Sequence, residues 1–226
     1  REQLASFAMN SAPLSFISNE EKIQIFNVAI EEMNKNVIEN HLNPRQHLFL
    51  GILYSNGGLF DAALDTLQKA LILSPKKHQI ISAIAEIYLK KGDVDSAIKY
   101  LERNFNNSPE FDSARLNLAS IYIFSGKIAE GEKLLMDRYG TLEIPESALV
   151  NVYSNAKNYS RLAGVLRAFV LQSPKEASYR ADLADTYVRL GRFSEAIKTL
   201  EEGISIIEDQ NSKDELSAKL RLIRGF

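Results

Sequence analysis

The chain has 226 residues, of which 45% are hydrophobic and 25% are charged, a composition that is typical of folded globular proteins and excludes an intrinsically disordered chain. Its formal net charge of -2 provides no positive field, so neither nucleic acid nor an anionic bilayer is expected as a partner. The absence of cysteine excludes disulfides, thiolate metal sites and a cysteine nucleophile.

No run of residues approaches the roughly 18 apolar positions that a membrane-spanning helix needs, so this segment is not expected to insert into a membrane. The chain begins with Arg1 rather than Met, and no signal-peptide pattern follows. We therefore expect a piece of a longer protein or a processed form. The compartment stays open, with a soluble cytoplasmic segment as the default expectation.

Residues 1–43 predict a degenerate pair of helices. The second helix is expected over residues 19–40, where two glutamates follow Asn19 and apolar side chains recur at spacings of three and four. These side chains are Ile23, Phe26, Ala29, Ile30, Met33 and Val37. The first helix is expected around Glu2 to Asn10.

Residues 44–210 show an internal period of 34 residues. Tyrosines and glycines each follow this period with one interruption, and a Ser-Pro pair closes three of the units. A fixed period of this length predicts a stack of helical repeats. The tyrosine series is Tyr54, Tyr88, Tyr122, Tyr153 and Tyr187, and the five predicted units are 44–77, 78–111, 112–142, 143–176 and 177–210.

Each unit reads as two helices joined by a tight turn. In the second unit, residues 78–92 and 93–104 each carry apolar side chains on one helical face. Gly92 between them is expected to adopt a positive φ, and Asp93 is expected to cap the helix that follows. The tyrosines of the 34-residue series are expected to pack between the two helices of each pair.

Two units and the C-terminus depart from this pattern. The unit 112–142 is three residues short and has Gly131 at a position where other units have alanine. Its second helix is expected to end early, and a new helix is expected to start at Pro145. The unit 143–176 has Lys157 where glycine is expected, and a changed superhelical angle is predicted around these units. Residues 211–226 predict a capping helix that Ser212 begins, with an apolar stripe of Leu216, Leu220 and Ile223.

The first unit carries the residues of a known family at fixed offsets: Leu50, Gly51, Tyr54, Gly58, Ala63, Leu67, Ala70 and Pro75. This pattern resembles the tetratricopeptide repeat, a helix–turn–helix unit of 34 residues. The resemblance implies an all-α fold, a right-handed superhelix of antiparallel helix pairs. It also implies a non-catalytic scaffold that binds a protein or peptide, with no cofactor and no metal.

In this family the first helices of the pairs line a concave groove. The positions that match the family's groove residues fall in all five units, and amide and apolar side chains there would suit an extended peptide. They are Arg45, Phe49, Ile52 and Asn56 in the first unit; Gln79, Glu86 and Lys90 in the second; Asn117, Ser120 and Phe124 in the third; Asn151 and Asn155 in the fourth; Asp182, Asp185 and Arg189 in the fifth.

The sequence argues against three more specific functions: chaperone-tail binding, metal binding and glycoside hydrolysis. Some relatives bind a chaperone's C-terminal carboxylate through lysine and asparagine, but Leu48 and Ile52 stand at those positions here. The three histidines lack a second ligand on a common face, which argues against a metal site. The carboxylate pair Asp182 and Asp185 has the residue types of a glycosidase, yet on repeat helices such pairs are usually solvated. An enzyme is therefore not expected.

A second, weaker resemblance concerns the segments Arg1–Ala8 and Leu73–Lys77. Together with the repeats, they are similar to the soluble C-terminal region of bacterial O-antigen ligase or polymerase-like membrane proteins. This resemblance implies an accessory domain attached to an upstream membrane domain, at the extracytoplasmic face. Three hypotheses therefore stand: a peptide- or protein-binding scaffold, an accessory domain of this kind, and self-association through exposed end helices.

Overall fold

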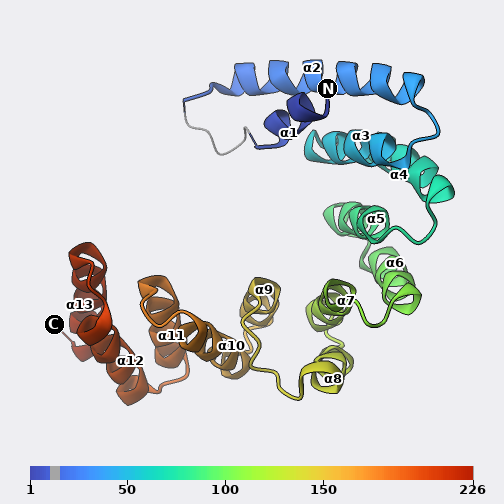
Figure 1. Cartoon of the computed structure of the whole chain (residues 1–226). Helices are drawn as coiled ribbons and strands as arrows, with labels where there is room; N and C mark the ends of the chain where they lie inside the picture. The colour runs from blue at the N-terminus through green and yellow to red at the C-terminus, as the bar shows by residue number, and fades with distance from the viewer. Residues whose placement is uncertain (11–15, 226) are drawn as a thin grey trace. The chain divides into compact units, whose positions relative to one another are not determined.

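The computed structural model describes residues 1–10 and 16–225, which form 13 α-helices and no β-strand (Figure 1). The prediction of an all-α helical repeat is confirmed. The helices are α1 Glu2–Asn10, α2 Asn19–Glu39, α3 Pro44–Asn56, α4 Phe60–Leu73, α5 His78–Lys90, α6 Val94–Asn107, α7 Asp112–Phe124, α8 Ile128–Tyr139, α9 Ser147–Asn155, α10 Tyr159–Gln172, α11 Ala177–Arg189, α12 Phe193–Ile206 and α13 Gln210–Arg224.

The chain divides into two compact units, Arg1–Ala114 and Arg115–Phe226, and the boundary lies within α7. In unit 1, α3 packs against α4 and α5 against α6, while α2 contacts α3 and α4 contacts α5. The side chains that fill this unit form two clusters. One contains Ala5, Ala8, Ala29, Met33, Leu50 and Leu53, and the other contains Ala63, Leu67, Ala70, Leu71, Ile80, Ile81, Ile84 and Ile87.

The turns at Gly58, Gly92 and Gly191 share one hydrogen-bond pattern. The residue after the positive-φ glycine donates its backbone N–H to the carbonyl of the repeat tyrosine, as Asp93 does to Tyr88 at 2.9 Å. Gly92 has a φ of 79°, as expected, and Asp93 caps α6 by accepting a hydrogen bond from the Ser96 N–H. This main-chain bond fixes the glycine four positions after the residue whose carbonyl accepts it, but a backbone carbonyl does not select tyrosine at that position.

Lys157 occupies the same left-handed turn without being a glycine. Its φ is 52°, the only positive φ of a non-glycine residue among the described residues. The Asn158 N–H still donates to the Tyr153 carbonyl at 2.9 Å, and Asn158 caps α10. The turn geometry is therefore imposed by the helices it joins, even though a side chain with a Cβ disfavours it.

We expect Lys157→Gly to stabilise the protein. Relief of the left-handed backbone outweighs the added flexibility of glycine in the unfolded chain, so the gain should be about 0.5–1 kcal/mol in the free energy of unfolding. Guanidinium denaturation followed by circular dichroism measures it. Lys157→Ala is the matched control, because it removes the same side chain but keeps the Cβ. An equal gain in both variants would show that the lysine charge, not the backbone, is responsible.

Unit 2 has one continuous core that runs from α7 to α13. Its fully buried members include Leu135 on α8, Tyr153 on α9, Val165 on α10 and Leu200 on α12. Leu216 of α13 is also fully buried, with Leu220 and Ile223 packed beside it, so α13 covers the end of this core with the stripe expected from the sequence.

Gly131 lies where α8 crosses α7. A Cβ placed on it would stand 2.6 Å from the Ala119 carbonyl oxygen and 2.7 Å from Ile123 Cγ1. The residue that departs from the repeat pattern in the sequence is therefore required by the close approach of these two helices.

Arg180 of α11 is the largest polar side chain in the core of unit 2, with 7% of its side chain exposed. Its Nε donates to the Pro174 carbonyl at 3.0 Å and its Nη1 donates to the Thr199 carbonyl at 3.3 Å. The aliphatic stem packs against Gly203 of α12. One guanidinium thus joins the α10–α11 turn, α11 and α12.

The repeat tyrosines do more than pack within their own pairs. The Tyr54, Tyr153 and Tyr187 hydroxyls each lie within hydrogen-bond distance of a polar side chain on the preceding helix, at 3.1, 3.4 and 3.4 Å. These three side chains therefore also contact the neighbouring repeat, and Tyr54 packs at the same time against the core cluster that contains Ala63 and Leu67 of its own pair. Tyr88 packs within its own pair, stacking on Tyr100 of α6.

Two helix starts differ from the sequence analysis. Helix α9 begins at Ser147, two residues after Pro145, because Glu146 is its N-cap. Helix α13 begins at Gln210, and its cap is Asp209 rather than Ser212. The Asp209 carboxylate accepts a hydrogen bond from the Ser212 N–H at 2.8 Å, which also holds the pKa of Asp209 below its ordinary value.

Candidate partner-binding surfaces

In unit 2 the first helices of the pairs turn polar residues away from the core. Asn151 and Asn155 recur at a spacing of four on α9 and are exposed, whereas Leu149, Val152 and Tyr153 of the same helix are buried. Neither of the two asparagine amides has a hydrogen-bond partner within the described chain. An unpartnered asparagine offers one acceptor and two donors, which match the C=O and N–H groups of an extended backbone.

The predicted residues of α11 lie on one helical face, and two of them have intramolecular partners. Asp185 pairs with Lys219 of α13 at 2.5 Å, and the Arg189 guanidinium lies 5.4 Å from the centre of the Tyr159 ring on α10. Asp182 forms no ion pair among the described residues. Partial burial, and then the charge of Asp185, raise the pKa of its carboxyl.

We expect Asp182→Asn to stabilise the protein at neutral pH. Because the folded-state pKa is raised, the folded protein binds more protons than the unfolded chain as the pH falls, so ionised Asp182 destabilises the fold above that pKa. The advantage of the asparagine variant should be full at pH 7 and vanish below the ordinary carboxyl pKa. Urea denaturation of both proteins between pH 3 and pH 7 measures it. An advantage that grows on acidification would contradict the assignment.

The predicted residues of α7 are less uniform. Phe124 is 52% exposed, as an apolar anchor site requires. Asn117 and Ser120 are half-buried, and Ser120 Oγ is shielded from solvent without a hydrogen-bond partner. Only Phe124 is therefore accessible enough to serve as a contact in this conformation.

In unit 1, some of the predicted residues of α3 and α5 contact other side chains of the chain, whereas others are exposed or half-buried. Arg45 pairs with Glu2 of α1 at 2.8 Å, and Phe49 packs against the N-terminal core cluster. Lys90 bridges from α5 to Ser55 of α3 at 3.2 Å and pairs with Glu86 at 2.8 Å. The remaining predicted residues are Ile52, which is half-buried, and Asn56 and Gln79, which are exposed.

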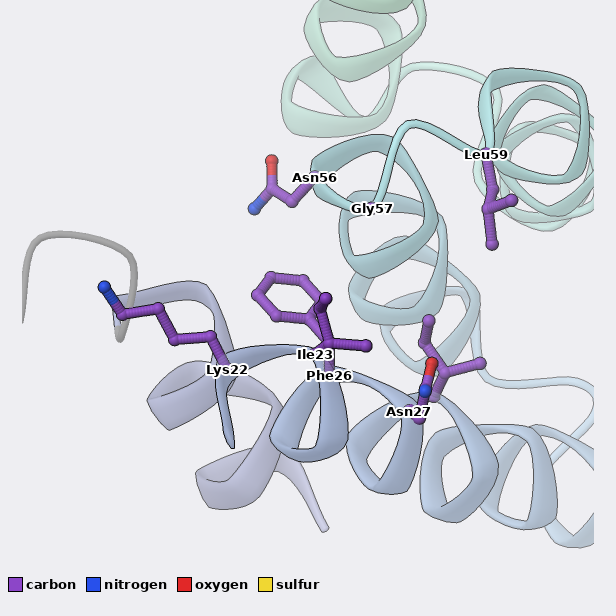
Figure 2. A pocket seen from close by; sticks show the side chains of 8 residues that line it. Lys22, Ile23, Phe26, Asn27, Asn56, Gly57 and Leu59 are labelled. Carbon is purple, nitrogen blue, oxygen red and sulfur yellow. The ribbon is translucent and has the colours of Figure 1, made fainter. Parts of the chain in front are cut away.

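A pocket of about 380 Å³ lies between α2 and the turn that joins α3 to α4, within unit 1 (Figure 2). Of the predicted site residues, only Asn56 lines it. The other lining residues are Lys22, Ile23, Phe26, Asn27, Ile30, Gly57 and Leu59. Sequence periodicity placed Ile23 on the apolar face of α2, but the structure leaves it 61% exposed in the pocket wall. The sequence signal available for this site was an apolar residue, Leu59, directly after the Gly57-Gly58 pair.

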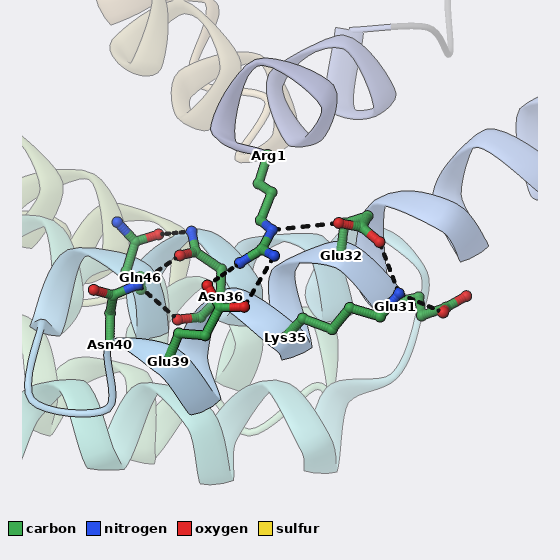
Figure 3. A network of polar contacts seen from close by, with 8 residues as sticks. All are labelled: Arg1, Glu31, Glu32, Lys35, Asn36, Glu39, Asn40 and Gln46. Atoms are coloured by element: carbon green, nitrogen blue, oxygen red, sulfur yellow. Dashed lines mark hydrogen bonds and ion pairs between the residues drawn. The ribbon is translucent and has the colours of Figure 1, made fainter.

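Charged side chains join Arg1, which directly precedes α1, to α2, the helix that forms one wall of the pocket (Figure 3). The Arg1 guanidinium reaches Glu32 at 3.3 Å and Glu39 at 3.0 Å. Hydrogen bonds to Glu32 and Glu31 raise the pKa of Lys35 to about 12. The network is largely solvent-exposed and links Arg1 to α2, so its effect on stability is expected to be small.

In the part of the chain that the structure describes, no group of three or more His, Asp or Glu side chains is arranged to hold a metal ion. None of the described helices is long and apolar enough to cross a bilayer.

Two family models match the chain. The model described as tetratricopeptide repeat matches residues 177–210, where the fifth repeat is expected, and the model described as tetratricopeptide repeat protein 21 ARM repeat matches residues 17–127. No curated protein sequence matches the chain.

Solved structures match over nearly the whole chain. A tetratricopeptide repeat protein from Parabacteroides merdae aligns with a TM-score of 0.60 at 18% identity, covering 99% of this chain and 86% of its own. The APC/C hetero-tetramer Cut9–Hcn1 aligns with a TM-score of 0.57 at 17% identity, covering 98% and 41%. Pseudomonas aeruginosa pilF aligns with a TM-score of 0.53 at 16% identity, covering 81% and 93%.

These similarities agree with the geometry of the helix pairs, their shared turns and their 34-residue spacing. At identities below 25% they carry information about the fold and not about the partner. The chain has the all-α helical-repeat fold of tetratricopeptide-repeat proteins.

Proposed function

We propose that the chain is a non-catalytic scaffold that binds a peptide or a partner protein on the exposed faces of its first helices. The observation that carries this proposal is the pair of exposed, unpartnered amides on α9, Asn151 and Asn155. Both side chains are exposed rather than packed in the core, and neither forms a hydrogen bond with another residue that the structure describes. Together with the exposed Phe124 and the acidic Asp182, these two amides are the predicted site residues of unit 2 that remain accessible to a partner.

The chemistry of this set indicates the kind of ligand. Side-chain amides can hold a main chain without selecting its sequence, whereas a half-exposed aromatic ring contributes an apolar contact. Asp182 would favour a basic side chain, because a nearby cation relieves the repulsion from Asp185. A segment with a basic residue is therefore the expected partner for unit 2.

A selection experiment tests the proposal. Octapeptides from a random phage-displayed library are selected on the immobilised full chain, and their affinities are measured by fluorescence polarisation. The double variant Asn151→Ala, Asn155→Ala should lose at least tenfold in affinity, about 1.4 kcal/mol or more. Because neither amide has a hydrogen-bond partner in the described part of the chain, the melting temperature should be unchanged.

Asn106→Ala is the matched control, since Asn106 is also exposed but lies on α6, the second helix of its pair. This control should bind like the wild type. Selection of no peptides at all, or peptides whose binding survives the double substitution, would refute the assignment to α9. Asp185 is a poor probe here, because reversing its charge also breaks its ion pair with Lys219.

The accessory-domain hypothesis stays a prediction from the resemblance of Arg1–Ala8 and Leu73–Lys77 to O-antigen ligase-like proteins. The coding sequence upstream of Arg1 decides it. About ten apolar segments upstream, each close to 20 residues long, would support attachment to such a membrane domain. A different upstream sequence would exclude it without affecting the binding proposal. Self-association also remains open, and light scattering across a concentration series tests it.

A further inference from the structure

Helix α13 has one uncovered face at the end of the core of unit 2 (Figure 1). It packs on α12 and α11, just as the first helix α5 packs on α4 and α3. Ala184 of α11 lies 34 positions before Ala218 of α13 and is fully buried, in a pair that α12 completes. Ala218, by contrast, is exposed, and Leu222 beside it is 75% exposed. Among the described residues no second helix covers these side chains, so the face is open to a helix of another chain.

Six exposed residues of α13 share this face, because they recur at spacings of three and four. They are Asn211, Asp214, Glu215, Ala218, Arg221 and Leu222. Glu215 and Arg221 each lie three positions from Ala218, and Asp214 and Leu222 each lie four positions from it. The face is therefore acidic on one side of a small central residue and basic on the other.

The charges of this face are available for an intermolecular contact. Arg221 and Glu215 form no hydrogen bond or ion pair with the described residues, and Asp214 accepts one hydrogen bond from a glutamine of its own helix, at 2.8 Å. Lys219 and Arg224 flank the face but pair with carboxylates of α11 and α12. Because those two cations are neutralised within unit 2, they do not cancel the acidic end of the face.

We propose that α13 pairs antiparallel with α13 of a second copy of this chain, about a two-fold axis at Ala218. This register places Asp214 and Glu215 of each copy opposite Arg221 and Leu222 of the other. Asp214 and Arg221 stand on the same side of Ala218 around the helix, so the Asp214 carboxylate is the nearer partner of the Arg221 guanidinium. Each contact occurs twice, because in an isologous interface both subunits use the same surface.

The side chains at the centre of the face suit a contact between two helices. Ala218 is small enough for the two backbones to approach closely, and Leu222 of each copy then loses exposed apolar surface against the other helix. A parallel arrangement would instead place like charges side by side, which disfavours it. One helix pair is a smaller contact than the roughly 1,600 Å² of a standard interface, so we expect a weak dimer that forms only at high concentration.

This inference is independent of the proposed peptide site. It gives self-association a helix, a register and a symmetry, whereas the peptide proposal rests on the two amides of α9. The Asn151→Ala, Asn155→Ala variant should therefore self-associate like the wild type. Loss of either activity leaves the other intact, so the two proposals can fail separately.

Sedimentation equilibrium of the full chain over a concentration series tests the inference. We expect a monomer–dimer equilibrium that weakens as salt is added. Arg221→Glu and the double variant Asp214→Lys, Glu215→Lys should each weaken the dimer about tenfold or more, because each places like charges against one another twice. A mixture of these two variants should form a heterodimer of nearly wild-type affinity, since both of its contacts again join opposite charges.

Lys133→Glu is the matched control, because Lys133 is exposed on α8 of the same unit and forms no hydrogen bond or ion pair with the described residues. It changes the net charge as Arg221→Glu does and should self-associate like the wild type. Recovery in the mixture also shows that the two charge-reversed variants are folded. A chain that stays monomeric throughout the series, a dimer that survives Arg221→Glu, or a mixture that does not associate would each overturn the inference.

Discussion

Arg180→Ala should lower the free energy of unfolding by about 2–4 kcal/mol. The substitution removes the two hydrogen bonds that the guanidinium donates, to the Pro174 and Thr199 carbonyls, and opens a cavity beside Gly203. Guanidinium denaturation followed by circular dichroism measures the loss. Because the bonds join the α10–α11 turn to α12, hydrogen exchange should rise in α11 and α12 before it rises elsewhere in unit 2.

Arg180→Lys provides a graded version of this experiment. Lysine keeps the charge and most of the aliphatic stem but lacks the planar fork that reaches two carbonyls at once, so an intermediate loss is expected. Arg221→Ala is the control, because Arg221 is an exposed arginine on α13 whose side chain forms no hydrogen bond or ion pair with the described residues. Equal losses in the Arg180 and Arg221 variants would show that net charge, rather than the buried bonds, determines stability.

Gly131→Ala should destabilise the protein by up to about 2 kcal/mol, although alanine is the residue that other repeats carry at this position. Alanine is worth about 1 kcal/mol more than glycine inside a helix, but overpacking a helix contact typically costs about 1–3 kcal/mol. The overpacking dominates here because the new Cβ would meet the Ala119 carbonyl oxygen at 2.6 Å, and a backbone atom cannot move aside without shifting α7.

Gly164→Ala is the matched substitution, and we expect it to raise the free energy of unfolding rather than lower it. Gly164 lies inside α10, where a new Cβ would meet only the Glu143 side chain, at 3.2 Å, and a small shift of that half-exposed side chain relieves the contact at the expense of part of its ion pair with Arg167. We expect a gain of up to about 1 kcal/mol from helix propensity. Equal effects of the two substitutions in thermal denaturation would contradict the close α7–α8 contact.

The sequence was sufficient to predict the helix pairs, because a 34-residue period couples local signals that reinforce one another. Tyr88, Gly92 and Asp93 show why: one residue supplies the carbonyl, one the positive φ and one the cap, all within a single turn. Such signals are local, so they can be recognised without knowledge of tertiary packing.

The availability of the predicted site residues could not be predicted in the same way. Arg45, Asp185 and Lys90 stand at positions that match the family's groove residues, yet each pairs with another side chain of this chain. Ion pairs across repeats depend on which side chains two helices bring together, and helical phase alone does not contain that information. The pocket on α2 was missed for the same reason, since its two walls come from different helices.

The ion pairs between successive repeats have a consequence for how the chain folds. Asp185 and Lys219 are 34 positions apart, Asp61 and Lys91 are 30 apart, and Glu132 and Arg161 are 29 apart. Each closes a loop of about one repeat, so the entropy lost on forming it is small and does not grow as repeats are added. Folding can therefore start at any helix pair and spread to its neighbours, and during synthesis a completed pair can fold as soon as the next one has left the ribosome.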